Sequence, residues 1–286
     1  MTIVVTGATG HLGHLIVEAL LRDGATASEI VAGGRNVAKL EDLAAEGVTT
    51  VSLDYNDAAS IAAALDGADI LVLVSASDPG QRLPQHRALV DAAVAAGVKR
   101  IVYTSAPKAT TSGLVLAPDH KATEELIEAS GIPFTILRNN WYTENYVGDA
   151  KQSAQTGALV ASVGDGRVAS ASRKDYADAA AVVVLNPGHE GKIYELSGDV
   201  AWTHDDLAAA ISELTGKPVA YTPIDSEAHR ELLKSHGLDD GTAGFVVALQ
   251  RNIREGDLDD TSGDLARLIG RPTTPLRAGL AEALAS

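Results

Sequence analysis

The sequence has no cysteine, only 4% aromatic residues, and far fewer basic than acidic side chains. The absence of cysteine excludes disulfides, thiolate metal sites and cysteine nucleophiles. Asp and Glu number 38 against 23 Lys and Arg, which gives a formal net charge of −15. Because nucleic acids and anionic membranes both attract basic surfaces, this balance argues against either partner.

Long apolar runs are missing as well. No apolar stretch approaches the roughly 18 residues of a membrane-spanning helix, and no basic-then-apolar signal segment opens the chain. We therefore expect a cytoplasmic protein that inserts into no membrane. With 286 residues, 45% of them hydrophobic, the chain is long enough for a sizeable core in one or two domains.

The first 24 residues carry the clearest pattern. Residues 2–6 form a β-branched run typical of a buried strand, glycines follow at 7, 10 and 13, and apolar residues then recur at helical spacing. A strand, a glycine-rich turn and a helix form a phosphate cradle, because unpaired N–H groups and the helix dipole favour an anion. We assign the tight turn to Gly7, the approach of a pyrophosphate to Gly10, and helix packing to Gly13. The spacing is G-x-x-G-x-x-G rather than G-x-G-x-x-G, and a merely structural turn is the alternative.

Strands and helices alternate through the first half of the chain. Further strands are predicted at residues 29–34, 48–53, 69–75, 100–105 and 134–138, with helices at 36–46, 58–65, 85–97 and 120–130 between them. The strands are apolar on both faces, which indicates a parallel sheet covered on both sides. The sequence therefore predicts an α/β fold, a Rossmann-like doubly wound parallel sheet with helices on both faces.

Ligands of such a sheet bind at the carboxyl ends of its strands. An NAD site would place Asp or Glu at the end of the second strand, but this chain has Arg35 after two glycines. A carboxylate there would repel a 2′-phosphate, whereas the guanidinium of Arg35 offers it a planar fork of donors, and Lys39 could add a second cation. The sequence therefore favours NADPH over NADH, with a solvated surface arginine as the alternative.

The third and fourth strands end in further cofactor candidates. Asp54 follows the third strand, where an adenine ring would lie; Ser75, Ala76 and Ser77 follow the fourth, beside the sugar and phosphates. Small side chains there let the backbone approach the cofactor. Asp54 is equally compatible with a helix cap or a turn, and both interpretations stay open.

The alternation loosens after residue 140. Residues 158–163 and 167–172 are interpreted as two short paired strands, followed by a helix at 175–185, a strand at 193–196 and a helix at 203–214 opened by a Thr N-cap. We expect an NADP-binding Rossmann domain at 1–140. A smaller C-terminal α/β cap region at 141–286 would lie on the substrate side, packed against the first domain and sharing its crevice.

The glycine motif at residues 7–13 (GATGHLG) resembles that of the NmrA-like, atypical short-chain dehydrogenases. Other stretches resemble, more specifically, the bacterial type-2 NAD(P)H:quinone oxidoreductases: residues 80–87 (GQRLPQHR), 137–146 (LRNNWYTENY), 164–173 (GDGRVASASR) and 194–203 (YELSGDVAWT). The resemblance spans nearly the whole chain. Related reductases of triphenylmethane dyes share much of the pattern, with a poorer match at Trp141 and residues 144–146.

The resemblance implies an NADPH cofactor, a quinone acceptor and no flavin. Carried over by position, the cofactor residues would be Gly7, Thr9, Gly10, His11, Leu12, Gly13, Arg35, Ser75, Ala76, Ser77, Asn139, Asn140, Trp141 and Tyr142. The acceptor pocket would be bordered by Gly80, Gln81, Ala169 and Arg173. Trp141 and Tyr142 could also stack on a flat quinone, with core packing as the alternative.

Candidate catalytic residues are harder to read. Most carbonyl-reducing short-chain dehydrogenases need Tyr-x-x-x-Lys, whose Tyr donates a proton to the alkoxide, and no Tyr precedes a Lys by four positions here. Hydride addition to a quinone gives a phenolate, a weaker base than an alkoxide, so the missing pair suits a quinone reductase. The candidates are His120, Lys121 and Tyr103. His11 and His14 have the spacing of a metal pair, but no third ligand is near in sequence, so we expect no metal.

Different functions stay open. One is a quinone reductase that transfers hydride directly from nicotinamide to a small-molecule quinone. Another is an NmrA-like redox sensor that binds NADP(H) without turnover. A third is a reductase of another flat, electron-poor acceptor such as a triphenylmethane dye. A homodimer is left open.

Overall fold

The protein was analysed as a computed structural model, which describes residues 1–76 and 80–285. Its centre is a seven-stranded parallel sheet in the order β3-β2-β1-β4-β5-β6-β9. The strands are β1 (Ile3–Val5), β2 (Ile30–Gly34), β3 (Thr49–Ser52), β4 (Ile70–Leu73), β5 (Arg100–Ser105), β6 (Phe134–Asn139) and β9 (Lys192–Leu196). The strand order reverses between β1 and β4, where open α/β sheets bind ligands. The predicted Rossmann-like fold is confirmed.

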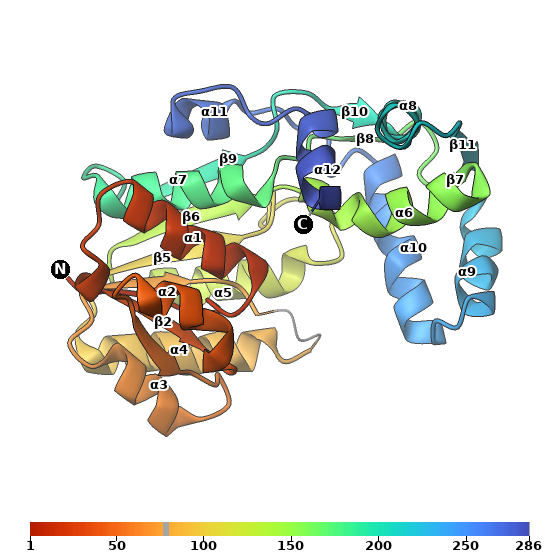
Figure 1. The fold of residues 1–286 in the computed structure, drawn as a ribbon. Helices are drawn as coiled ribbons and strands as arrows, with labels where there is room; N and C mark the ends of the chain where they lie inside the picture. Colours follow the sequence, from red (N-terminus) through yellow and green to blue (C-terminus); the bar gives the residue numbers. More distant parts are fainter. Residues whose placement is uncertain (77–79, 286) are drawn as a thin grey trace.

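Helices cover both faces of this sheet (Figure 1). One face carries α1 (His11–Arg22) and α7 (Arg173–Leu185), and the other carries α3 (Ala58–Leu65), α4 (Arg82–Ala96) and α5 (Ala117–Ala129). Successive strand residues point to opposite faces, so Ile3 and Val5 pack with α1 while Val4 joins the cluster under α3 and α4.

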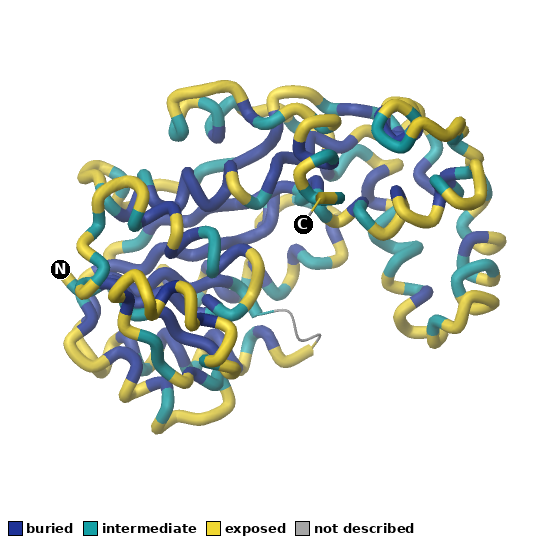
Figure 2. Tube along the Cα trace, in the orientation of Figure 1, coloured by how far each residue is buried: buried dark blue, intermediate teal, exposed yellow. Residues whose placement is uncertain are grey.

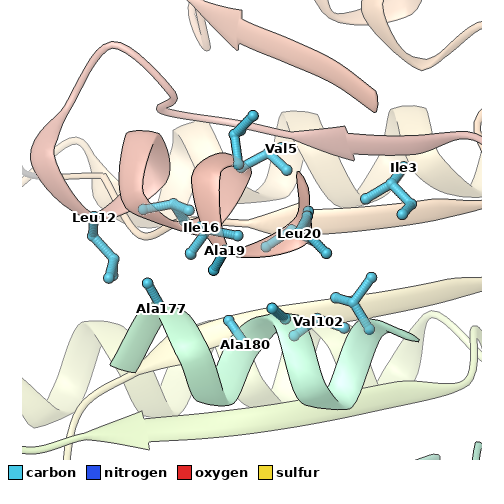
Figure 3. Packing of buried hydrophobic residues seen from close by; sticks show 14 of the residues in the cluster. Ile3, Val5, Leu12, Ile16, Ala19, Leu20, Val102, Ala177 and Ala180 are labelled. Carbon is cyan, nitrogen blue, oxygen red and sulfur yellow. The ribbon is translucent and has the colours of Figure 1, made fainter. Parts of the chain in front are cut away.

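The contact between α1 and α7 fixes the helix that follows the glycine turn. Figure 3 shows Leu12 and Ile16 of α1 facing Ala177 and Ala180 of α7 across a short gap. Alanines have no side chain beyond Cβ, so the two helices can approach closely and bury the apolar face of α1. The helix α7, from the second half of the chain, therefore covers the apolar face of α1.

Most of the remaining elements pack around a third apolar cluster, beside the carboxyl ends of the strands. They are η3 (Thr143–Tyr146), α6 (Val147–Thr156), β7 (Ala158–Ala161), β8 (Arg167–Val168), β10 (Trp202–Thr203), α8 (His204–Thr215), β11 (Ala220–Pro223), α10 (Asp240–Arg254) and α12 (Leu276–Ala285). The helix α9 (Ser226–Ser235) packs on α10, and α11 (Asp264–Ile269) packs against α7 and β9 in the first cluster. In Figure 1, α9 and α10 project as a helical pair away from the sheet. None of the helices in residues 1–76 and 80–285 has the length and hydropathy needed to cross a membrane.

Two local predictions are wrong. The helix expected at 36–46 is a 3-10 turn, η2 (Val37–Leu40), followed by the short α2 (Glu41–Ala45), and the Asn36 side chain makes no cap bond. The strands expected to pair around residues 164–166 find other partners: β7 pairs with β11 and β8 with β10. Both new partners lie beyond residue 200. The packing of the whole region therefore decides which strands pair, and a turn sequence between two strands does not predict it.

Two further differences are small. A short 3-10 turn, η1 (Ala27–Glu29), precedes β2. The helix α6 was not predicted, because its sequence buries only Ala150 and Ser153 and so shows little apolar periodicity.

The predicted Thr cap is confirmed: Thr203 and Asp206 form a reciprocal capping box at the start of α8.

Candidate active site

The glycine turn between β1 and α1 has the geometry of an anion site. Gly7 has φ +62°, and a Cβ added at Gly13 would lie 2.3 Å from the Gly7 carbonyl oxygen. These values match the tight turn and close helix packing expected at the two positions. The first turn of α1 has no side-chain cap and no acidic residue. Its backbone N–H groups are therefore open to a bound anion.

A cavity of about 520 Å³ opens above this turn, at the carboxyl ends of the sheet strands. The predicted cofactor residues that line it are Gly7, Thr9, Gly10, His11, Leu12, Gly13, Arg35, Asp54, Ser75, Ala76, Asn139, Asn140, Trp141 and Tyr142. Ser77 lies outside the described residues. The structure thus gathers residues from five strand ends around one volume, whose size is in the range of small-molecule and cofactor sites.

Arg35 stands at the end of β2 with its side chain exposed at the cavity wall. It forms no ion pair with any residue in the described part of the chain. Lys39 lies on η2 and does not line the cavity. A guanidinium without a carboxylate partner is available to an incoming phosphate.

Asp54 lines the cavity and also has the turn role considered from the sequence. Its Oδ1 accepts hydrogen bonds from the backbone N–H (2.9 Å) and side-chain amide (3.2 Å) of Asn56. The neighbouring Tyr55 donates its hydroxyl proton to the Val74 carbonyl (3.2 Å), and burial raises the pKa of Tyr55 to about 12. Tyr55 therefore contributes a neutral aromatic wall where an adenine ring would lie.

The segment after β4 is anchored by His86, a contact that the sequence did not predict. Its Nε2 accepts the Ala76 N–H (3.0 Å), and burial lowers the pKa of His86 to about 3, so the ring is neutral. Its Nδ1–H is then left to donate to Thr123 Oγ1 (2.9 Å), whose hydroxyl donates to the Asp119 carbonyl (2.9 Å). Arg82 Nε adds a bond to the Ala76 carbonyl (2.9 Å).

Of the three candidate catalytic residues, only His120 lines the cavity. The Tyr103 hydroxyl lies 2.7 Å from His120 Nδ1, and Tyr103 itself is fully buried. Burial holds the pKa of His120 well below its usual range and raises that of Tyr103, so both groups are neutral. In the tautomer in which Tyr103 donates to Nδ1, the proton of the imidazole lies on Nε2. Lys121 lies on the outer side of α5 beside Glu125 (3.9 Å).

The far wall is formed by residues after β6. Tyr142 packs edge-on against Tyr176 at 5.3 Å, and the Arg173 guanidinium lies 4.7 Å from the Tyr142 ring centroid. Asn139 donates an amide hydrogen to the Tyr142 hydroxyl (3.4 Å), while its Oδ1 is buried without a hydrogen-bond partner among the described residues. A buried acceptor of this kind at a cavity wall is suited to a donor on a bound molecule.

Three residues expected at the acceptor pocket are placed elsewhere. Ala169 is fully buried, and its backbone bonds to Leu258 and Gly198 hold it in the C-terminal core. Gly80 and Gln81 lie just before α4; both residues are exposed, and neither lines the cavity. Arg173, Trp141 and Tyr142 do line it.

The end of β5 and the loop after it supply a further part of the cavity wall, which was not predicted. Ser105, Ala106 and Pro107 line the cavity, and Lys108 follows with φ +46°. A left-handed backbone is uncommon outside glycine, and here the Lys108 N–H is held by Glu195 Oε2 (2.9 Å).

A buried arginine connects that loop to the sheet. Arg138 binds Glu195 (2.8 Å) and Glu124 (2.6 Å), and Ser105 donates to Glu124 (2.5 Å). No local motif predicts these contacts, because the residues that make them come from four separate elements, β5, α5, β6 and β9.

His11 and His14 do not point to a common ligand. His11 lines the cavity, whereas His14 Nε2 lies 2.9 Å from Asp42 and 3.7 Å from Glu18 on the exposed side of α1. His14, Glu18 and Asp42 could converge on an ion, but exposed acidic groups are common without one. We assign no metal site there.

Comparison with known proteins places this geometry in context. The NmrA-like family matches residues 1–260. The chain is 48% identical over 274 residues to quinone oxidoreductase 2 of Escherichia coli (strain K12), covering 96% of each chain. It is 27% identical to the NAD(P)H azoreductase of Xenophilus azovorans, covering 94% of this chain and 93% of that one.

Solved structures agree with these matches. The NADPH complex of an NADPH-dependent quinone oxidoreductase from Escherichia coli superposes with a TM-score of 0.93 at 47% identity and covers 99% of both chains. The NADP(H) complex of Citrobacter sp. triphenylmethane reductase gives a TM-score of 0.93 at 39% identity, covering 99% of this chain and 100% of that one.

Proposed function

This chain belongs to the NmrA-like family, and from that premise we propose that it is an NADPH-dependent quinone oxidoreductase. The observation that carries the proposal is the cavity itself. It joins an uncapped helix N-terminus, and an arginine that has no ion-pair partner among the described residues, to an aromatic wall within one volume. The first two features suit the phosphates of NADPH, and the third suits a flat acceptor ring.

The residues present fit the cofactor. The N–H groups at the start of α1 would hold the pyrophosphate, and the absence of a side chain at Gly10 leaves it room. Arg35 would bind the 2′-phosphate, and Tyr55 would lie against the adenine. The unpartnered Asn139 Oδ1 would accept a hydrogen bond from the nicotinamide end.

NADPH supplies a hydride when it is bound, and the protein's part is to place and stabilise the acceptor. Trp141 and Tyr142 would hold the quinone ring against the nicotinamide face, since hydride transfer requires the reacting atoms to lie ~3–3.5 Å apart. The Nε2–H of His120 would donate a hydrogen bond to the quinone oxygen that gains negative charge. A neutral donor is sufficient, because the charge is delocalised through the phenolate ring.

The first test is NADPH oxidation with and without a simple quinone, on protein assayed for bound flavin. We expect quinone-dependent turnover by flavin-free protein and little turnover of simple aliphatic ketones, whose alkoxide product needs a stronger proton donor. A triphenylmethane dye belongs in the same assay, because the similarity to triphenylmethane reductase makes a second flat acceptor the alternative. Tight NADPH binding without turnover of any acceptor would favour a redox sensor.

The same assay tests the role of His120. His120→Ala should lower kcat for the quinone roughly tenfold, the rate factor that corresponds to losing one hydrogen bond to a charged oxygen. The affinity for NADPH should stay near that of the unchanged protein. Lys121→Ala is the matched control, because Lys121 is the next residue on α5 and lies outside the cavity. Equal losses in the two variants would show that His120 does not act on the acceptor.

A further prediction concerns the choice of cofactor. NADPH should bind roughly tenfold to a hundredfold more tightly than NADH, because a charge-assisted contact from Arg35 is worth ~1.5–3 kcal/mol. Arg35→Ala should remove most of this preference, whereas Lys39→Ala, away from the cavity wall, should retain it. Equal affinities of the unchanged protein for the two nucleotides, measured by titration, would contradict the assignment of Arg35.

We keep the division at residue 140 as part of the proposal, with one refinement. Residues 1–140 would hold most of the cofactor, and residues 141–286 would complete the acceptor side. The second stretch also contributes to the first, because β9 is a strand of the central sheet and α7 packs on one face of that sheet. A cytoplasmic location and a homodimer remain expectations from the sequence.

A further inference from the structure

The helix α10 has two faces of different character. Ala243, Gln250 and Arg254 share the face that packs toward α9 and β7: Ala243 is fully buried, Gln250 accepts the Ser162 N–H (2.5 Å), and Arg254 donates to the Ser162 carbonyl (2.9 Å). Phe245, Leu249 and the buried Asn252 follow one another at spacings of four and three residues. They therefore form a separate stripe on the opposite side of the helix.

That second stripe is turned toward the candidate active site. Asn252 accepts the Val115 N–H (3.0 Å) and donates to the Gly113 carbonyl (2.8 Å). Leu114 and Leu116, on either side of Val115, line the cavity, and Leu249 packs against the same apolar cluster as Leu114. The apolar wall of the cavity therefore continues onto α10.

The outer part of this wall is exposed to water. Val115 and Phe245 are 38% and 41% exposed, which places them among the few large apolar side chains exposed in the described residues. Figure 2 shows that much of α10 is half-buried or exposed, in contrast to the dark sheet layer. Phe245 precedes Asn252 by seven residues, so the stripe extends roughly 10 Å along the helix. Exposed apolar surface that continues a ligand cavity indicates an apolar extension of the ligand.

We propose that Leu116, Val115, Leu249 and Phe245 form a strip that binds an apolar chain attached to the quinone ring. The inference rests on the proposed quinone reductase function and narrows its substrate class to quinones with a long alkyl or prenyl substituent. The ring would lie at Trp141 and Tyr142, and the chain would leave the cavity past Leu116 and cover Val115 and Phe245. Burial of each methylene group on the strip favours such acceptors over the bare ring.

The test compares two benzoquinones that share one ring and differ only by a decyl chain. In the unchanged protein, kcat/KM should be at least roughly tenfold higher for the decyl quinone. Val115→Ser and Phe245→Ser should each reduce that ratio about threefold to tenfold, mainly through the KM of the decyl compound. Val94→Ser, at a 50% exposed valine on the outer side of α4, is the matched control and should leave the ratio and the basal turnover unchanged.

Each other outcome has a distinct meaning. A ratio near one in the unchanged protein, or an equal ratio in all variants, would overturn the strip while leaving the quinone reductase function standing. No turnover of either quinone would overturn the function and the strip together. Light scattering on Phe245→Ser completes the test, because a change of mass would show that the exposed stripe joins two copies of the chain rather than binding the acceptor.

Discussion

Gly10→Val should abolish NADPH binding while the protein still folds. Gly10 has φ −100° and ψ 165°, a backbone conformation open to any residue. Among the described residues, an added Cβ would meet only the Gly7 carbonyl oxygen, at 3.3 Å. The two methyl groups of valine would then occupy the space over the first N–H groups of α1. Losing even two charge-assisted hydrogen bonds to the pyrophosphate costs ~4 kcal/mol, or roughly a thousandfold in affinity.

Gly13→Val is the matched contrast, with the same substitution three residues later. Its Cβ would lie 2.3 Å from the Gly7 oxygen and 2.9 Å from the Ala8 Cα, and both contacts are to backbone. Since α1 is also fixed against α7, this variant should lose stability or fail to fold. Circular dichroism separates the two effects from NADPH titration. Normal NADPH binding by Gly10→Val would mean that the cofactor lies elsewhere, and a Gly13→Val protein as stable as the original would contradict the packing argument.

The protein should be strongly destabilised by mild acid. His86 and His204 are almost completely buried, and burial lowers their pKa values to about 3 and about 4, against ~6.5 in an unfolded chain. Above pH 6.5 both states are neutral and the full stability is present. As the pH falls from 6.5 toward 4, the unfolded chain gains protons that the folded protein cannot accept, so stability is lost.

By pH 5 each of the two histidines should remove about 2 kcal/mol from the free energy of unfolding, or about 4 kcal/mol together. Burial also lowers the pKa of His120, which acts in the same direction. A total of this size is a large fraction of the ~5–15 kcal/mol that stabilises most domains. Urea unfolding at pH 8 and pH 5 measures the net difference, in which Asp149 opposes the histidines: burial raises its pKa to about 6, so its protonation favours the folded state by about 1.4 kcal/mol at pH 5.

His204→Phe should remove roughly half of that 4 kcal/mol difference. His204 packs among the rings of Tyr146, Trp202 and Tyr221, and its Nδ1 has no partner among the described residues, so phenylalanine should fit there. His236→Phe, at an exposed position after α9, is the control and should leave the difference in place. Equal stability of the unchanged protein at both pH values would show that these histidines can protonate within the fold.

The parts of the site that the sequence predicted are those made by neighbours in the chain. A strand, a turn and a helix place Gly7, Gly10 and Gly13 within a few residues of one another, and Arg35 is fixed by the end of its own strand. Local spacing carries this information, because strand and helix periods decide which residues meet the cavity.

The parts that the sequence did not predict depend on how the helices pack against the sheet. His86 meets Ala76, and His120 meets Tyr103, only after α4 and α5 have packed beside the sheet. Lys121 was an equal candidate with His120 because the two are adjacent, but successive helical residues point about 100° apart. The exchange of partners by β7 and β8 has the same origin, since both new partners are far along the chain.

The position of β9 in the sheet has a consequence for how the protein is made. As the chain leaves the ribosome, β6 remains an open sheet edge until residue 196 has been synthesised, and the apolar face of α1 stays uncovered until α7 emerges. An open edge and an uncovered helix face both favour association with other chains. A nascent chain that stops near residue 140 would therefore hold a complete glycine turn on an unfinished sheet, a form that chaperones and proteases would be expected to recognise.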